Sequence, residues 1–426
     1  MNRLAVLAAW VRARYRPPFR SREALERWQD AAARRLLATI VPRSPFYARH
    51  FAGHDLADWR QLPTIDKPTM MANLTGLNTR GIDADEAMRV ALAAEASRDF
   101  RPEIGGVTVG LSSGTSGSRG LFLVTPEERL AWAGTILARV LPDRILGLRP
   151  HRIAFFLRAN SNLYETVGSS RIAFTFFDLV EPLDGHVGRL ADLKPTILVA
   201  PPSVLRALAD SGVRIAPDRV VSVAEVLDPL DEAVIRRTFG RTVHQVYQAT
   251  EGLLGSTCAF GTLHLAEDVV AIQREPLGDG RFSPIVTDLH REGQPIVRYR
   301  LNDVLVEREV PCLCGSVMVG LERVEGRADD CFHVRTKSGW RVLFPDVVRH
   351  AIVAASNLTA FGVRQVTANQ VELYVDGPFD AAATGLATAW TRLGAAPPEI
   401  RRLDAWTPVG PRKLKRVECL FRRDDA

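Results

Sequence analysis

The chain has 426 residues, which is more than one hydrophobic core usually serves, so we expect two domains. Hydrophobic residues make up 46% of the chain and charged residues 24%, as in ordinary soluble globular proteins. The net charge of +6 comes from basic residues that are scattered rather than grouped in blocks, so we predict no nucleic-acid partner.

The N-terminal segment has a short apolar run in residues 1–12, too short to span a membrane. Arg12, Arg14 and Arg16 come at its end and after it, and no small-residue cleavage site appears, which argues against a signal peptide. The plain interpretation is an amphipathic helix. Because no other segment is long and apolar enough to span a bilayer, we expect a cytoplasmic protein with no membrane partner.

The next elements alternate between helical and strand-like patterns. Residues 20–41 have helical spacing with Ser21 as the cap, and residues 64–69 form a turn into another helix. From about residue 104 to residue 240, short apolar runs alternate with helical patterns, which favours α/β layers around a largely parallel sheet. The clearest strand candidates are 153–157, 196–199 and 220–223, and the clearest helix candidates are 202–210 and 231–239.

The pattern becomes strand-rich between about residues 255 and 325, which predicts a smaller β subdomain. After Arg327, strand-like and helical pieces restart over a length sufficient for a small α+β domain. We therefore predict an α/β fold. Its N-terminal domain, residues 1–326, holds layered α/β sheets and the β subdomain, and a mobile C-terminal domain spans residues 327–426.

Residues 111–120 (LSSGTSGSRG) are the most informative segment. They follow an apolar run and precede a strand-like run at residues 121–124. Glycines let backbone N–H groups turn inward and hydroxyl groups add donors, so the loop can wrap phosphate oxygens. It is not a Walker A loop, because no Gly-Lys-Ser/Thr closes it. The alternative interpretation is a flexible Ser/Gly loop.

A second candidate site holds three cysteines and a histidine, the residues Cys258, His264, Cys312 and Cys314. A Cys₃His set is a common composition of structural zinc sites, with no open position for chemistry. Tight turns at Gly261 and Gly315 would let the two halves converge. The spacing is not that of a standard finger, and the alternative is free thiols and a lone histidine in a reducing compartment. Cys331 and Cys419 are interpreted as ordinary thiols.

Four further motifs follow the loop along the chain, at residues 247–252 (YQATEG), 298–303 (RYRLND), 326–330 (GRADD) and 410–416 (GPRKLKR). This ordered series resembles the adenylate-forming superfamily of acyl-CoA synthetases, firefly luciferases and peptide-synthetase adenylation domains. Within that superfamily it is most similar to the phenylacetate–CoA ligase branch and to its relatives that adenylate a deazaflavin coenzyme. Five motifs in order are far more specific than any one of them.

The resemblance implies an ATP site. Tyr247 would lie against adenine, Thr250 near the α-phosphate and Glu251 on Mg²⁺, which prefers hard oxygen ligands. Asp303 would accept hydrogen bonds from the ribose hydroxyls, and Arg327 would contact the ribose as well. Arg119 stands near the position of the family's usual loop lysine. The implied phosphate ligands are Ser112, Ser113, Gly114, Thr115, Ser116, Gly117 and Arg119.

Lysine is rare in this chain, which contains only Lys67, Lys194, Lys337, Lys413 and Lys415. Lysine is a compact point charge on a flexible stem, so two lysines in one short motif attract notice. The resemblance makes Lys413 the residue that touches both the attacking carboxylate and the α-phosphate, with Lys415 as the second candidate. It also implies that Asp329 is the hinge of the C-terminal domain and that Gly339 lines the face for thiol attack.

The implied activity is ATP-dependent adenylation of a carboxylic acid, followed by transfer to a thiol with CoA as the default acceptor. Residues 224–227 would line the adenine, and residues 158–165 and 174–178 suit an aryl or short acyl acid, although their Phe residues can equally be sheet core. One alternative delivers the acyl group to a carrier protein, an amine or another nucleophile. Another is a zinc-stabilised nucleotide-binding protein without turnover. Whether the chain forms a homodimer stays open.

Overall fold

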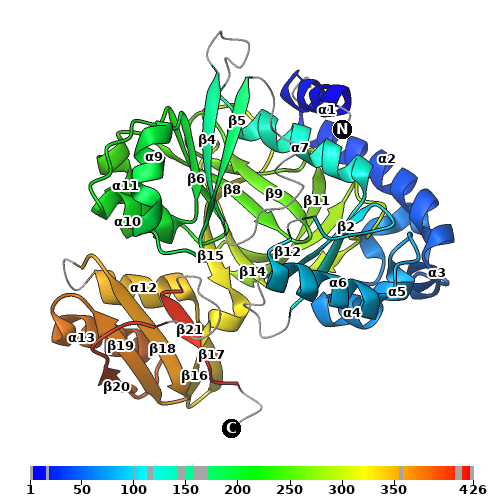
Figure 1. Cartoon of the computed structure of the whole chain (residues 1–426). Helices are drawn as coiled ribbons and strands as arrows, with labels where there is room; N and C mark the ends of the chain where they lie inside the picture. The colour runs from blue at the N-terminus through cyan, green and yellow to red at the C-terminus, as the bar shows by residue number, and fades with distance from the viewer. Residues whose placement is uncertain are drawn as a thin grey trace.

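The computed structural model describes residues 3–15, 19–99, 101–112, 119–142, 150–157, 171–354, 358–407 and 415–422. They form a large mixed α/β body and a smaller C-terminal body, coloured orange to red, that lies below it in Figure 1. The predicted α/β class is confirmed. The described residues contain no helix that is long and apolar enough to cross a membrane.

The N-terminal segment is helical. Ser21 caps the helix predicted near residues 20–41, because its side chain accepts a hydrogen bond from the Ala24 backbone N–H at 3.2 Å. The helices are α1 (Arg3–Tyr15), α2 (Arg22–Ile40), α3 (Pro45–His50), α4 (Lys67–Ala72), α5 (Leu74–Leu77) and α6 (Ala84–Ser97), with 3₁₀ turns η1 (Val41–Arg43) and η2 (Leu56–Gln61). Helix α1 packs along α7 (Pro126–Val140).

A twelve-stranded sheet runs through the large body, and its first half is parallel. The parallel strands are β5 (Ile172–Asp178), β4 (His151–Leu157), β6 (Ile197–Ala200), β7 (Arg219–Val223) and β8 (Val243–Ala249), in that spatial order. Every residue of β6 is buried, as expected of a strand covered on both faces. Helices α9 (Asp184–Leu193), α10 (Pro202–Asp210) and α11 (Pro229–Phe239) gather on one side of these strands (Figure 1).

The strand-rich segment continues the same sheet instead of forming a separate one. Its strands pair antiparallel, starting from β8. They are β9 (Gly252–Thr257), β10 (Leu263–Leu265), β11 (Val270–Gly278), β12 (Arg281–Asp288), β13 (Tyr299–Arg300), β14 (Asp303–Glu307) and β15 (Gly320–Arg327). A separate three-stranded sheet of β1 (Glu103–Ile104), β2 (Val107–Leu111) and β3 (Leu121–Val124) carries the Ser/Gly loop between β2 and β3.

The C-terminal body follows the 3₁₀ turn η3 (Ala328–Asp330) and has its own apolar core. That core includes Trp390 and Phe361, both about 1% exposed, and the thiols of Cys331 and Cys419 are buried. The elements are β16 (Phe332–Thr336), β17 (Gly339–Leu343), α12 (Pro345–Val353), β18 (Phe361–Thr367), β19 (Gln370–Val375), α13 (Phe379–Arg392), β20 (Glu399–Arg402) and β21 (Val417–Cys419).

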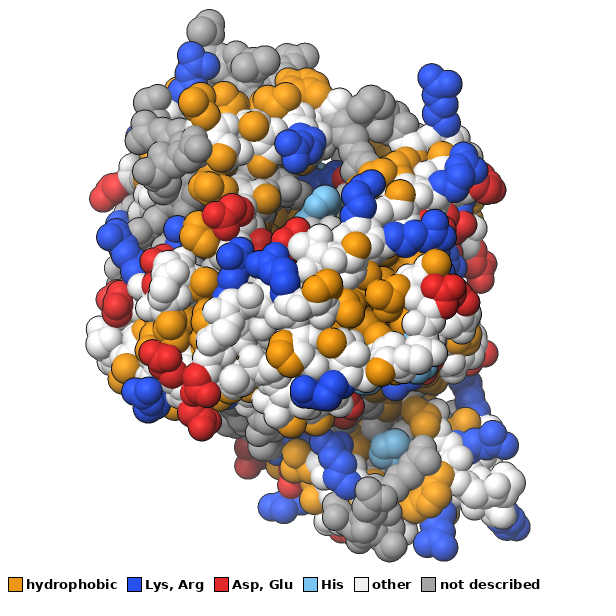
Figure 2. Space-filling view, turned by 90° about the vertical axis from the view of Figure 1, so that its right-hand side faces the viewer, with side chains coloured by type: hydrophobic (Ala, Val, Ile, Leu, Met, Phe, Trp, Pro, Cys, Tyr) orange, Lys and Arg blue, Asp and Glu red, His pale blue; other side chains and the backbone are white. Residues whose placement is uncertain are grey.

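The charge on one face of the molecule is mixed. In the view of Figure 2, Lys and Arg side chains are interspersed with acidic and apolar ones, and the coloured residues show no continuous basic tract on that face. Binding to a nucleic-acid backbone depends on a basic tract that tracks its phosphates. The coloured residues of this face therefore show no such tract.

His244 on β8 makes stability depend on pH. Burial, together with the positive charge of Arg219, lowers the pKa of His244 to about 4, and the Arg219 Nη2 lies 3.3 Å from its Nδ1. An unfolded histidine has a pKa of about 6.5, so between these two values the unfolded chain binds more protons. The free energy of unfolding should therefore rise with pH through this window, and the contribution of His244 should be constant below about pH 4 and above about pH 6.5.

Urea unfolding at about pH 5 and about pH 7 checks this expectation, because the two values bracket most of the window. His244→Gln keeps a hydrogen-bonding side chain that does not titrate, so its free energy of unfolding should differ less between the two conditions than that of the natural chain. An equal difference in both proteins would contradict the role of His244.

Candidate active site

A cavity of about 1840 Å³ is lined by residues of both bodies. Its walls combine loops of the large body with η3 and with Lys415 and Arg416 of the C-terminal body. The lining includes the predicted residues Ser112, Arg119, Tyr247, Thr250, Glu251, Asp303, Arg327 and Asp329. The predicted Ser113, Gly114, Thr115, Ser116, Gly117 and Lys413, and residues 158–165, lie outside the described residues.

The neck of the Ser/Gly loop is held closed by two hydrogen bonds between its ends. The Ser112 backbone N–H donates to the Gly120 carbonyl at 2.7 Å, and the Gly120 N–H donates to the Ser112 Oγ at 2.7 Å. Strands β2 and β3 pair directly below, with Leu111 opposite Leu121. The hairpin thus presents the loop from a rigid base at the cavity wall.

Arg119 lines the cavity but is held at its rim by helix α6. Its Nη2 donates to the Glu95 Oε1 at 2.8 Å, and the second guanidinium nitrogen pairs with the other carboxylate oxygen. The side chains are 39% and 49% exposed. This pairing lowers the pKa of Glu95 and keeps the Arg119 guanidinium turned toward α6.

The turn between β8 and β9 presents Thr250 and Glu251 to the cavity. Thr250 Oγ1 donates to the Glu251 Oε2 at 2.9 Å, and Glu251 is only 7% exposed. Buried Arg291 donates from Nη1 to the Thr250 carbonyl at 2.6 Å and from Nη2 to the Leu123 carbonyl of β3 at 3.1 Å. Arg291 therefore joins this turn to the loop hairpin. The motifs did not identify it, because no local pattern marks a residue whose contacts to the turn and to β3 are made with distant backbone carbonyls.

Asp303 lies between a tyrosine and an arginine. The Tyr247 hydroxyl donates to the Asp303 Oδ2 at 2.5 Å, and the Arg327 Nε lies 4.0 Å from its other oxygen. Burial and the Asp303 carboxylate raise the pKa of Tyr247 well above its usual value, so the phenol stays protonated. Burial and the charge of Glu251 likewise raise the pKa of Tyr299, which shares this wall. The Asp303 carboxylate therefore has the neutral phenol of Tyr247 beside it, and the Glu251 carboxylate has that of Tyr299.

The expected adenine-lining segment, residues 224–227, does lie in the cavity wall. Ala224 has φ +67°, a left-handed conformation that costs free energy for a residue with a Cβ and that gathers at functional sites. The aromatic segment divides between two roles. Phe174 lines the cavity with its ring 5.1 Å from that of Phe155, whereas Phe177 is fully buried and stacks on Phe156 in the core.

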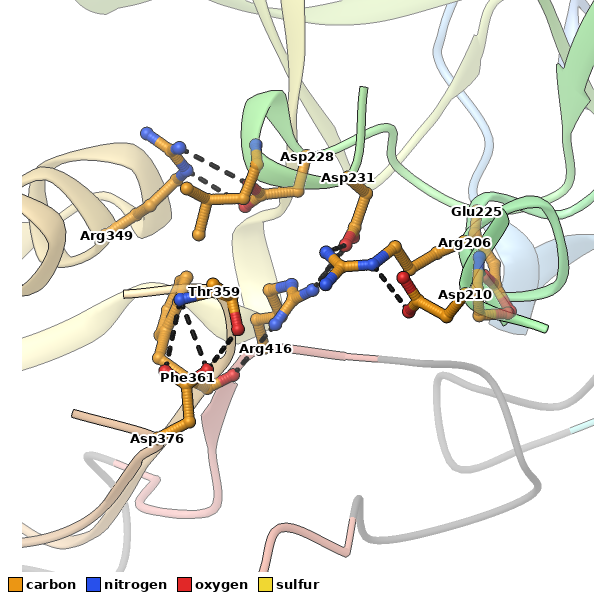
Figure 3. A network of polar contacts seen from close by, with 12 residues as sticks. Arg206, Asp210, Glu225, Asp228, Asp231, Arg349, Thr359, Phe361, Asp376 and Arg416 are labelled. Atoms are coloured by element: carbon orange, nitrogen blue, oxygen red, sulfur yellow. Dashed lines mark hydrogen bonds and ion pairs between the residues drawn. The ribbon is translucent and has the colours of Figure 1, made fainter. Parts of the chain in front are cut away.

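Ion pairs join the C-terminal body to the helices of the large body (Figure 3). Arg416 donates from Nη2 to both carboxylate oxygens of Asp231 on α11, at 2.7 and 2.9 Å, and Asp231 is 1% exposed. Arg349 of α12 pairs with Asp228, which also caps α11, at 2.9 Å. We call Asp228, Asp231, Arg349 and Arg416 the interdomain latch.

The predicted hinge lies beside this latch. Asp329 accepts a hydrogen bond from the Asn302 side chain, and its neighbour Asp330 pairs with the Lys415 Nζ at 3.0 Å. Lys415, the second candidate for the catalytic lysine, is thus engaged with η3 in this arrangement. Gly339 has φ +111° at the turn between β16 and β17, and it is not among the cavity residues.

The three cysteines and the histidine of the second candidate site come together, as predicted. All four ligand atoms lie within 4.8 Å of one another. The Cys258 and Cys312 sulfurs are 3.7 Å apart, and the Cys314 sulfur is 3.3 Å from the His264 Nε2. Turns at Gly261 (φ +85°) and Gly315 (φ +71°) bring the two halves together.

Comparison with solved structures identifies the class of fold. The chain matches 2-hydroxyisobutyryl-CoA ligase in its postadenylation state, bound to R3-HIB-AMP, with a TM-score of 0.68 and 14% identity, over 96% of this chain and 92% of that one. The same ligase in its thioesterification state, with 2-HIB-AMP and CoA, gives a TM-score of 0.55 and 16% identity, over 95% and 91% of the two chains.

No family model matches the chain. In sequence it is similar to phenylacetate–coenzyme A ligase from Thermus thermophilus, with 24% identity over 392 residues that cover 83% of this chain and 82% of that protein. The resemblance seen in the motifs is confirmed. The chain has the fold of these acyl-CoA ligases and is similar in sequence to one of them along most of its length.

Proposed function

We propose that the protein activates a carboxylic acid with ATP and Mg²⁺ and then passes the acyl group to a thiol. The observation that carries this proposal is the convergence in one cavity of the loop neck at Ser112, the Thr250–Glu251 turn and the Asp303 carboxylate. In this proposal a carboxylate oxygen attacks the α-phosphorus of ATP, the bond to the bridging β-phosphate oxygen breaks, and pyrophosphate leaves. The product is an acyl-adenylate.

The residues fit the proposed ligands chemically. Glu251 offers hard carboxylate oxygen atoms, the kind that Mg²⁺ prefers, and the ion would neutralise charge on the phosphates. The Thr250 hydroxyl beside it would lie near the α-phosphate. The Asp303 carboxylate, oriented by Tyr247, would accept hydrogen bonds from the vicinal ribose hydroxyls. Residues 224–227 would border the adenine. Lys413 remains the proposed catalytic lysine, and Lys415 lines the cavity two residues further along the chain.

The apolar side chains in the cavity lining support an aryl or short acyl substrate. Val140, Phe155, Leu157 and Phe174 are among these lining residues, and the rings of Phe155 and Phe174 are 5.1 Å apart. Apolar walls with a few placed polar groups suit a small acid whose carboxylate points toward the phosphates. CoA is the proposed acceptor by analogy with the related ligases, and a carrier-protein thiol is the second candidate.

ATP–pyrophosphate exchange with Mg²⁺ and a panel of aryl and short acyl carboxylates, without any thiol, tests the adenylation step. Exchange that depends on one class of acid is the expected result and would define the substrate group. Adding CoA or a carrier protein then tests the acceptor. ATP binding without exchange for any acid would instead favour a nucleotide-binding protein without turnover.

We also propose that Cys258, His264, Cys312 and Cys314 hold a structural Zn²⁺ ion. Tetrahedral Zn–S bonds of about 2.3 Å imply sulfurs about 3.8 Å apart, close to the 3.7 Å between Cys258 and Cys312. The His264 Nδ1 lies 3.0 Å from the Met318 carbonyl, so an N–H there leaves Nε2 free to bind a metal. With four protein ligands the ion would tie β10 to the loop before β15.

Removing this metal should lower the stability of the large body. A metal that exceeds its Kd by 100-fold contributes about 3 kcal/mol, and a strong chelator removes that contribution. Differential scanning fluorimetry with and without the chelator, together with metal analysis of the purified protein, checks the prediction. Cys314→Ser should lower the melting temperature by itself and should then be insensitive to the chelator. A chelator effect of equal size in both proteins would contradict the site.

A further inference from the structure

Lys67 lies in the cavity, although no motif drew attention to it. It is the first residue of α4, and its placement is fixed by neighbouring backbone contacts. The Ile65 N–H donates to the Arg298 carbonyl at 3.1 Å, and the Ile65 carbonyl accepts from the Arg300 N–H at 2.8 Å. Asp66 then caps α4 by accepting from the Thr69 N–H at 2.9 Å. Lys67 is thus anchored to the strand that carries Tyr299.

The Lys67 side chain lies against the neck of the Ser/Gly loop. A Cβ built on Gly120 would be 3.1 Å from the Lys67 Cε and 3.8 Å from its Nζ. One turn further along α4, the Met71 sulfur accepts from the Leu121 N–H at 3.3 Å. Helix α4 therefore packs along the base of the loop, and any residue larger than glycine at position 120 would crowd the ammonium group.

The charges around Lys67 belong to the proposed ATP site. Burial lowers the pKa of Lys67, while the Glu251 carboxylate counteracts this and Arg327 adds to it. The ammonium group is therefore close enough to interact electrostatically with Glu251, the proposed Mg²⁺ ligand, and with Arg327, the proposed ribose contact. By comparison, Arg119 is held by Glu95, and the side chains of this pair are 39% and 49% exposed.

We propose that Lys67 is the cation that contacts the β- and γ-phosphates of ATP beside the loop neck at Ser112 and Gly120, in the role that the motif comparison gave to Arg119. The inference rests on the proposed function, because it assumes that ATP binds in this cavity. A flexible ammonium with three donors can follow phosphate oxygens as pyrophosphate leaves, and its contacts to an anion are charge-assisted. Lys67 comes from a helix far from the other motifs in sequence.

The test compares the binding of a non-hydrolysable ATP analogue with that of AMP, by calorimetry on the full chain. Lys67→Met should weaken binding of the ATP analogue by about 10- to 100-fold, the effect of losing a charge-assisted hydrogen bond, and should leave AMP binding nearly unchanged. Lys67→Arg should restore part of the loss, because it keeps the charge but not the compact head. Lys194→Met, at the end of α9 and outside the cavity lining, is the matched control and should bind both nucleotides normally.

Three outcomes would overturn the proposal. Equal weakening of the ATP analogue and AMP by Lys67→Met would mean that Lys67 supports the site without touching the β- and γ-phosphates. A loss of ATP-analogue binding in Arg119→Met but not in Lys67→Met would return the role to Arg119. Failure of the natural chain to bind either nucleotide would remove the proposed function itself, and this outcome is distinguishable because it does not depend on any substitution.

Discussion

Replacing Lys413 by alanine should slow ATP–pyrophosphate exchange by about 10²- to 10³-fold, the usual effect of removing one group that stabilises developing charge in the transition state. The Kd for ATP should change little, because the interaction is made mainly as the carboxylate attacks the α-phosphate. Exchange kinetics and calorimetric ATP binding, measured on the same preparation, separate the two effects.

Lys415 provides the matched control for this prediction. Its ammonium pairs with Asp330 at 3.0 Å, so Lys415→Ala removes a contact to η3 rather than the proposed catalytic group. We expect a smaller loss of exchange in Lys415→Ala than in Lys413→Ala. The reverse order would transfer the catalytic assignment to Lys415, and full activity in both variants would mean that this motif has no part in adenylation.

Replacing Asp231 by asparagine should free the C-terminal body from the orientation in which Arg416 pairs with Asp231 on α11. The Asp231 side chain is almost completely buried from solvent. It accepts two hydrogen bonds from Arg416 and forms an ion pair with Arg206 at 3.3 Å. Breaking a buried ion pair from one side costs about 3–5 kcal/mol, because the remaining charge is left without its partner. The Arg416 side chain can regain hydration if the two bodies separate. The free-energy cost of leaving its charge unpaired should therefore favour separation of the bodies over unfolding of the chain.

The two half-reactions measure this effect. Adenylation in single turnover should slow by at least about 10-fold in Asp231→Asn. Once the orientation with the Arg416–Asp231 pair is the minor state, each 1.4 kcal/mol of destabilisation lowers its population about tenfold. Transfer from a preformed acyl-adenylate should slow less. Asp210→Asn is the control, since its exposed carboxylate also pairs with Arg206 but does not reach the C-terminal body. Equal losses in both half-reactions of Asp231→Asn would contradict a role in orientation.

The ion pairs of the interdomain latch give a structural reason for the orientation of the C-terminal body against the helices of the large body. The chain matches the postadenylation state of 2-hydroxyisobutyryl-CoA ligase with a higher TM-score than the thioesterification state of the same enzyme, 0.68 against 0.55. A buried pair such as Arg416 with Asp231 favours one orientation because it is satisfied only there. In the proposed cycle, the latch would have to open before thiol attack.

The amino-acid sequence by itself determined the class of fold and the motif residues Tyr247, Glu251 and Asp303 of the cavity wall. Apolar runs alternating with helical periodicity mark the parallel strands, because burial on both faces demands such runs. The motifs around Tyr247, Asp303 and Arg327 were recognisable because each one is contiguous in the chain. The Cys₃His set was recognisable from residue types alone, since few combinations of residues make a metal site.

Only the tertiary structure decided which residues are partners. Lys67 and Arg119 both carry a positive charge beside the Ser/Gly loop, but the folded chain pairs Arg119 with Glu95 and places Lys67 in the cavity. Arg291 joins the Thr250 turn to strand β3 through backbone carbonyls, and Asp231 meets Arg416 across 185 residues. Such contacts depend on how separate elements pack, and local periodicity carries no information about which distant group satisfies a buried charge.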